Sequence, residues 1–83
     1  MKFRFSSRRL EALYTSGVGS RRYPVHVVDE FFEVLRIVDA AAGIGDLYAF
    51  KSLHFEKLSG DRSGQRSLRL NRQWRLIVTV DVE

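Results

Sequence analysis

Cysteine is absent from this chain of 83 residues, and proline occurs once. Without thiols the chain can form no disulfide framework, no thiolate metal site and no thiol nucleophile. The N-terminal run MKFRFSSRRL is charged and lacks the apolar stretch of a signal peptide. The apolar runs elsewhere are too short to span a membrane. We therefore expect a cytoplasmic protein that does not associate with membranes.

Motifs for metals and cofactors are missing as well. The two histidines are not accompanied by cysteines or clustered acids at the spacing of a metal site. The chain has no phosphate-binding glycine loop of the Walker type and no GxSxG elbow. A short chain also builds only one modest core, which leaves little room for a large organic cofactor. The sequence thus predicts one domain over 1–83 that works without a metal or a cofactor.

The charge that is present is mostly positive. Lys and Arg number 14 against 10 for Asp and Glu, which gives a net charge of +4 and a pI of about 10.0. Apart from Lys2, Lys51 and Lys57, these basic residues are arginine, whose planar fork of donors suits phosphates and base edges. Composition therefore points to a polyanionic partner. The alternative is a basic surface without a special site.

Helical patterns dominate the first half of the sequence. A short opening strand over 2–5, with alternating phenylalanines, is followed by a short amphipathic helix over 8–14. Ser6 or Ser7 is a suitable N-cap for that helix, and Gly17 is expected to end it.

A longer second helix is the most regular element of the sequence. Pro24 suits its first turn, and Gly43 is expected to end it. Residues 44–52 are ambiguous, with a helical turn around 46–48. The apolar positions that define the long helix recur at helical spacing over Val28, Phe31, Phe32, Leu35, Val38 and Ala42.

The second half changes to strand alternation. Strands are expected over 53–58, 66–70 and 74–82, separated by turns at 59–65 and 71–73. Helices followed by an antiparallel meander predict an α+β fold, with two N-terminal helices packed on one face of a small antiparallel sheet.

Basic residues are concentrated in this second half. Alternation places Arg69 and Arg75 away from the leucine and tryptophan face, so we expect both on the open face of the sheet, with Lys57 joining them from the neighbouring strand. Such a surface can hold a phosphate chain. The alternative is a solvated sheet face whose arginines only confer solubility. The basic residues from 57 to 75 are Lys57, Arg62, Arg66, Arg69, Arg72 and Arg75.

His54 stands at the expected start of the sheet. A histidine beside a phosphate clamp can move protons near neutral pH. The alternative is a partly buried or surface histidine without a role.

The run LHFEKLSGDRSGQRSLRLNRQWRL over 53–76 carries a resemblance. It is similar to the pattern EKLxGDRxGxxSIRIxxQWRI of the HigB-type killer toxins in the RelE/ParE superfamily. The resemblance implies a RelE-like fold and a partner antitoxin, commonly with a helix-turn-helix domain. It also implies cleavage of mRNA in the ribosomal A site, by metal-independent attack of the RNA 2′-hydroxyl on the adjacent phosphate.

The resemblance also suggests roles for the basic residues. Arg62, Arg69 and Arg75 suit the stabilisation of a phosphate that gains charge in the transition state. Lys57 suits either that role or proton transfer, and His54 is the candidate proton carrier. Arg66 and Arg72 are candidates for further contacts with RNA phosphates.

This chain departs from the family pattern in three places. Ser59 stands where the family often has lysine, and the histidine of many members lies closer to the Gly-Asp-Arg motif than His54 does. The chain ends at Glu83, where the family usually continues into another strand. Two alternatives follow: a non-cleaving inhibitor of the same fold, as in ParE-like relatives that act on DNA gyrase, and a plain basic nucleic-acid-binding module. A missing final strand would also leave the last strand as an exposed edge, which an antitoxin segment or a second copy is expected to cover.

Overall fold

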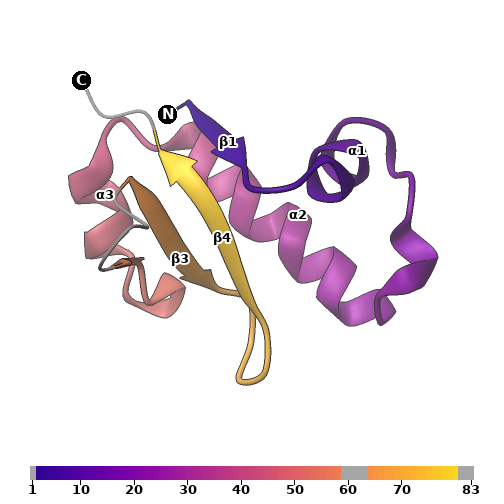
Figure 1. The fold of residues 1–83 in the computed structure, drawn as a ribbon. Coiled ribbons are helices and arrows are strands. Elements are labelled where there is room, and N and C mark those ends of the chain that lie inside the picture. Colours follow the sequence, from indigo (N-terminus) through magenta and orange to yellow (C-terminus); the bar gives the residue numbers. More distant parts are fainter. Residues whose placement is uncertain (1, 59–63, 81–83) are drawn as a thin grey trace.

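The computed structural model describes residues 2–58 and 64–80 of the chain. In these ranges the helices follow the first strand and precede the other strands of the same sheet (Figure 1). This architecture confirms the α+β class. The elements in chain order are β1 (Phe3–Phe5), α1 (Arg8–Ser16), η1 (Ser20–Arg22), α2 (Val25–Ala40), α3 (Ile44–Ala49), η2 (Lys51–Leu53), β2 (Glu56–Lys57), β3 (Gln65–Arg69) and β4 (Arg75–Val80), where η marks a 3-10 helix.

The sheet is antiparallel throughout, with the strand order β1-β4-β3-β2. The opening strand pairs with the last one, so that Phe3 lies opposite Val80 and Phe5 opposite Val78. The expectation that the last strand is an exposed edge is therefore wrong for Val78–Val80, the half of β4 that pairs with β1. Among the described strands, β1 and β2 are the edges, because the N-terminal strand occupies the position beside β4.

Local signals place α1 as expected. The Ser7 side chain accepts a hydrogen bond from the backbone N–H of Leu10 at 3.2 Å, so Ser7 is the N-cap. At the other end Gly17 adopts a left-handed conformation with φ of 73° and donates its N–H to the carbonyl of Leu13. The helix runs to Ser16, two residues beyond the expected end, because the glycine cap rather than the last apolar residue ends it.

The long helix α2 ends earlier than predicted, at Ala40 rather than at Gly43. Ala41 is already extended, and the backbone N–H of Ala42 donates to the Asp46 carboxylate at 3.0 Å. This contact joins the turn to α3. The helical turn expected around 46–48 is thus part of α3, a helix of 6 residues.

The predicted strand over 53–58 is wrong in its first half. Leu53 belongs to η2, His54 is left-handed, and only Glu56–Lys57 form the strand β2. Leu53 and Phe55 are nevertheless both buried, at 1% and 6% exposure. A 3-10 turn that reverses direction at His54 buries alternate residues just as a strand does, which explains the misleading pattern.

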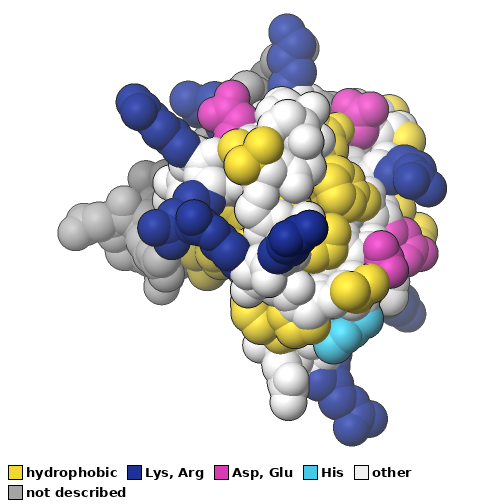
Figure 2. Space-filling model, turned by 90° about the vertical axis from the view of Figure 1, so that its right-hand side faces the viewer, with side chains coloured by type: hydrophobic (Ala, Val, Ile, Leu, Met, Phe, Trp, Pro, Cys, Tyr) yellow, Lys and Arg dark blue, Asp and Glu magenta, His cyan; other side chains and the backbone are white. Residues whose placement is uncertain are grey.

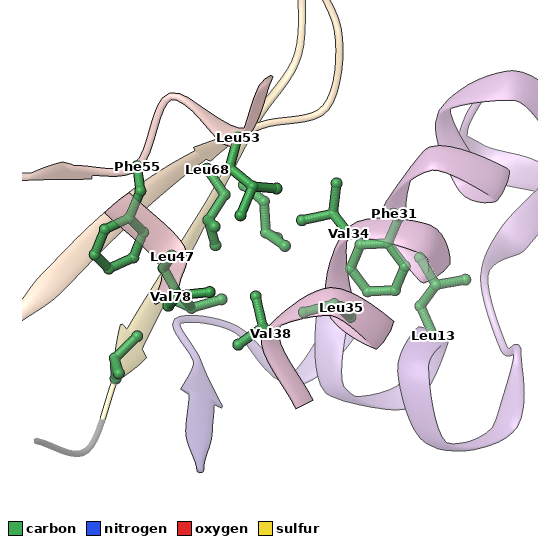
Figure 3. Packing of buried hydrophobic residues seen from close by; sticks show 12 residues of the cluster. Leu13, Phe31, Val34, Leu35, Val38, Leu47, Leu53, Phe55, Leu68 and Val78 are labelled. Atoms are coloured by element: carbon green, nitrogen blue, oxygen red, sulfur yellow. The ribbon is translucent and has the colours of Figure 1, made fainter. Parts of the chain in front are cut away.

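The core lies between one face of the sheet and the helices (Figure 3). Leu35 and Val38 of α2 meet Leu68 of β3 and Val78 of β4, all of them fully buried. Each such side chain contributes about 1.5–3 kcal/mol relative to an exposed one. Because this face is filled by apolar side chains, the opposite face of β3 and β4 is left for polar groups.

Candidate functional site

Two arginines lie directly opposite each other on the open face of the sheet. Arg69 of β3 pairs with Arg75 of β4, next to the buried pair of Leu68 and Leu76. Side chains that are directly opposite on neighbouring strands share a face and approach closely. The predicted shared position of the two arginines is therefore confirmed.

Polar partners hold both guanidinium groups in place. Arg75 Nε donates to the Ser67 hydroxyl at 2.5 Å, and Ser67 is only 2% exposed. Arg69 Nε donates to the backbone carbonyl of Asn71 at 3.2 Å. Bonds to a buried hydroxyl and to a main-chain carbonyl restrict the two side chains, although like charges repel across the strand pair.

His54 is where the two arginines converge. Arg75 donates from Nη2 to the His54 carbonyl at 2.9 Å, and Arg69 Nη1 lies 3.2 Å from His54 Nε2. The three residues lie just after η2, in β3 and in β4, and are up to 21 residues apart in the sequence. The structure thus brings together three of the four residues that the sequence singled out as catalytic.

The backbone at His54 is strained. Its φ is 45°, and it is the non-glycine residue with positive φ in the described part of the chain. Residues with a β-carbon adopt this left-handed conformation at a cost. The conformation directs both the carbonyl and the ring of His54 towards the arginines, and strain of this kind concentrates at functional sites.

The contact with Arg69 sets the direction of one hydrogen bond to the His54 ring. A guanidinium group has only donors, so Arg69 Nη1 donates and His54 Nε2 accepts. A group that draws Arg69 away would leave Nε2 free for another partner.

Glu56 is a member of this site that the sequence analysis missed. It lies opposite Ser67 in the β2–β3 register, and its carboxylate is 3.7 Å from Arg75 Nη2. Both side chains are well exposed, so the ion pair is screened by solvent. Alternation alone could not reveal this contact, because it depends on which residue of β3 faces β2.

The same register shows that the expected position of Lys57 is wrong. Lys57 lies opposite Arg66, and Arg66 lies opposite the buried Val78. Successive side chains of a strand point to opposite faces. Since Glu56 shares the face of Ser67, Lys57 is on the other face, at the β2 edge, and does not join the arginine pair.

The remaining predicted phosphate ligands are dispersed. Arg66 is half-buried, donates to the carbonyl of Gln65 at 3.2 Å, and has an Nε without a hydrogen-bond partner among the described residues. Arg72 is exposed in the turn between β3 and β4. Arg62 lies outside the described residues.

Asn71 attaches the β3–β4 turn to the helices. Its side-chain oxygen accepts the N–H groups of Gln73 at 2.8 Å and Trp74 at 3.1 Å. Its side-chain nitrogen donates to the Glu30 carboxylate of α2 at 2.6 Å. Because Arg69 bonds to the Asn71 carbonyl, this turn also positions one arginine of the site.

Comparisons with known proteins identify the family of this chain. The family model described as "RelE-like toxin of type II toxin-antitoxin system HigB" matches residues 3–82. The chain belongs to the HigB-like toxin family. The curated protein Toxin HigB-1 of Vibrio cholerae serotype O1 is 35% identical to it over 77 residues, which are 93% of this chain and 81% of the Vibrio protein.

Family membership confirms the resemblance drawn from residues 53–76, and the match extends well beyond that run. A type II toxin has a cognate antitoxin, so this HigB-like toxin has a protein partner. In the described residues no helix is long and apolar enough to cross a membrane. The same residues hold no group of three or more histidines and acids arranged to bind a metal ion.

Proposed function

We propose that this HigB-like toxin is an endoribonuclease that cuts mRNA in the ribosomal A site, in the cytoplasm. One observation carries the proposal: Arg69 and Arg75 converge on His54, at 3.2 and 2.9 Å. Two cations that suit a phosphate, next to an imidazole that suits proton transfer, are the groups that attack of a 2′-hydroxyl on a phosphate requires. The resemblance over 53–76 supports the ribosome, mRNA and a helix-turn-helix antitoxin as partners.

The arginine pair is the phosphate clamp. In the free protein Arg69 and Arg75 donate to neutral acceptors, namely the Ser67 hydroxyl and carbonyls of His54 and Asn71. Charge-assisted bonds to a phosphate are stronger than bonds to neutral acceptors. An RNA phosphate therefore competes well for the outward-facing nitrogens. It gains negative charge in the transition state, which strengthens these bonds further.

His54 is the proton acceptor. When Arg69 turns to the phosphate, His54 Nε2 is free to take the proton of the 2′-hydroxyl. The 2′-oxygen then bonds to phosphorus, the bond to the 5′-oxygen breaks, and that oxygen takes up a proton from water, while His54 returns its proton to the solvent. The products are a 2′,3′-cyclic phosphate and a 5′-hydroxyl end, and the reaction needs no metal.

The other basic residues serve the flanking RNA in this proposal. Arg72 is exposed in the turn between β3 and β4, and Arg66 and Lys57 lie towards the β2 edge, on the other face of the sheet from the arginine pair. Their contacts contribute affinity rather than chemistry, and Arg62 is assigned the same role from the sequence motif. We therefore assign Lys57 a role in RNA binding rather than in catalysis.

Programmed ribosomes provide the direct test. The purified toxin is incubated with them, and mRNA ends are mapped by primer extension. We expect cuts within the A-site codon that Arg75→Ala and His54→Ala reduce by about 10²–10⁴. Arg36→Ala, which removes an exposed arginine from α2, is the matched control and should cut normally. Equal cutting by all four proteins would contradict the proposal.

A non-cleaving inhibitor is the second candidate, and Glu56 is the observation that favours it. Its carboxylate lies 3.7 Å from Arg75, where it competes with an RNA phosphate. Ribosomes that bind the toxin but carry uncut mRNA would support this alternative. Membership in the toxin family sets aside the third alternative, a plain basic nucleic-acid-binding module.

A further inference from the structure

Two neighbouring hollows lie on the side of the molecule that carries α1, and the first of them reaches Arg75 at the start of β4. The first has a volume of about 270 Å³ and is lined mostly by apolar side chains, among them Leu10, Val28 and Leu76. The second has a volume of about 230 Å³ and lies around Val18. Arg9 and Tyr23 line both hollows, so the two hollows adjoin each other. We call the two hollows together the α1 groove.

The α1 groove begins where β4 lacks a neighbour. The strand pairs between β1 and β4 end at Phe5 and Val78, although β4 starts at Arg75. In the described part of the chain, Arg75–Ile77 therefore have no strand beside them on this side, and these residues line the first hollow. Phe5, the last residue of β1, stacks on Phe31 at 5.9 Å and shows how an apolar side chain fits beside β4.

The rim of the groove is basic. Arg8 and Arg9 of α1 and Arg21 and Arg22 of η1 are all exposed. None of the four makes an ion pair within the described residues. Figure 2 shows this side of the molecule, where Lys and Arg side chains stand around exposed hydrophobic patches. Val18, which lines the second hollow, is 64% exposed.

We propose that the α1 groove is the docking site of the cognate antitoxin, through an extended acidic segment with two apolar anchors. One anchor fills the hollow beside Leu76, the other covers Val18, and acidic residues between them meet Arg9 and Arg22. A phosphate chain satisfies the arginines but leaves the apolar hollows unfilled, which is why a protein segment fits better than RNA. The proposal rests on family membership, which implies an antitoxin, and not on cleavage of RNA.

A pair of valine variants gives a matched test. Val18→Glu places a carboxylate at the groove, while Val25→Glu makes the same change at a valine that is 77% exposed and lines neither hollow. Both sites are exposed, so the fold should tolerate both changes. Calorimetric titration with the purified full-length antitoxin should show binding weakened about tenfold or more by Val18→Glu and by less than about twofold by Val25→Glu.

Charge reversal tests the rim in the same way. Arg9→Glu should weaken antitoxin binding about tenfold or more, whereas Arg36→Glu on α2 should not. In hydrogen exchange followed by NMR, the antitoxin should slow the amides of Arg75 and Ile77. Equal binding by all variants, or unchanged exchange at these amides, overturns the proposal.

Two further outcomes would assign the groove to another occupant and overturn the proposal as well. In the first, Arg9→Glu abolishes ribosome binding and leaves antitoxin binding intact, which makes the groove an RNA surface. In the second, the toxin alone dimerises and Val18→Glu renders it monomeric, which makes a second copy the occupant. Because each readout is binding, failure here is distinguishable from failure to cleave RNA.

Discussion

Replacing His54 by glycine and by alanine separates the role of its backbone from that of its ring. Its φ of 45° lies in the left-handed region, which costs a residue with a β-carbon roughly 1–2 kcal/mol. Glycine avoids this cost but loses roughly 0.4–1 kcal/mol through the greater freedom of the unfolded chain. Since both variants lack the imidazole, His54→Gly should be more stable than His54→Ala by about 1 kcal/mol.

Thermal unfolding measures this difference. For a domain of this size, about 1 kcal/mol corresponds to a difference in Tm of roughly 4–8 °C. Ser52 in η2 provides the control pair, since its φ is not positive. There the order should reverse, with Ser52→Gly less stable than Ser52→Ala by roughly 0.5–1 kcal/mol. Equal Tm values for the two His54 variants would refute the strain argument.

The same variants test the chemistry. In the proposed mechanism both should lose about 10²–10⁴ of the cleavage rate, because neither has the imidazole that is proposed to take the 2′-hydroxyl proton. We therefore expect His54→Gly to be the more stable of the two and yet inactive. Normal cleavage by His54→Gly would show that the residue carries no proton and that only the arginines are needed.

Three further predictions concern the rest of the structure. Asn71→Ala removes the side-chain bonds to Glu30 and within the turn, and should lower the free energy of unfolding in urea by about 2–4 kcal/mol; an unchanged urea midpoint would contradict this. Glu56→Gln removes the carboxylate beside Arg75 and should tighten binding of a short single-stranded RNA, seen by fluorescence anisotropy, by up to about fivefold; weaker binding would argue against phosphate competition. Leu35→Ala empties a fully buried position and should cost about 2–5 kcal/mol in the same urea assay, so a loss below about 1 kcal/mol would show that the core closes around the gap.

The sequence by itself determined those features that depend on neighbouring residues. Ser7 and Gly17 mark the ends of α1 because capping involves only residues within one helical turn. Strand alternation likewise placed Arg69 and Arg75 on one face and Leu68 and Leu76 on the other, since the period of two is a property of each strand. The α+β class follows from these local patterns taken together.

Only the tertiary structure decided which distant segments meet. The pairing of β1 with β4, the register that brings Glu56 rather than Lys57 to the arginines, and the left-handed turn that aims His54 at them all depend on contacts across the chain. A shift of one residue in register moves every side chain of a strand to the other face, so local patterns cannot specify such a site. The sequence supplied the histidine and the arginines of the proposed site, and the contacts of His54 with β3 and β4 brought them together.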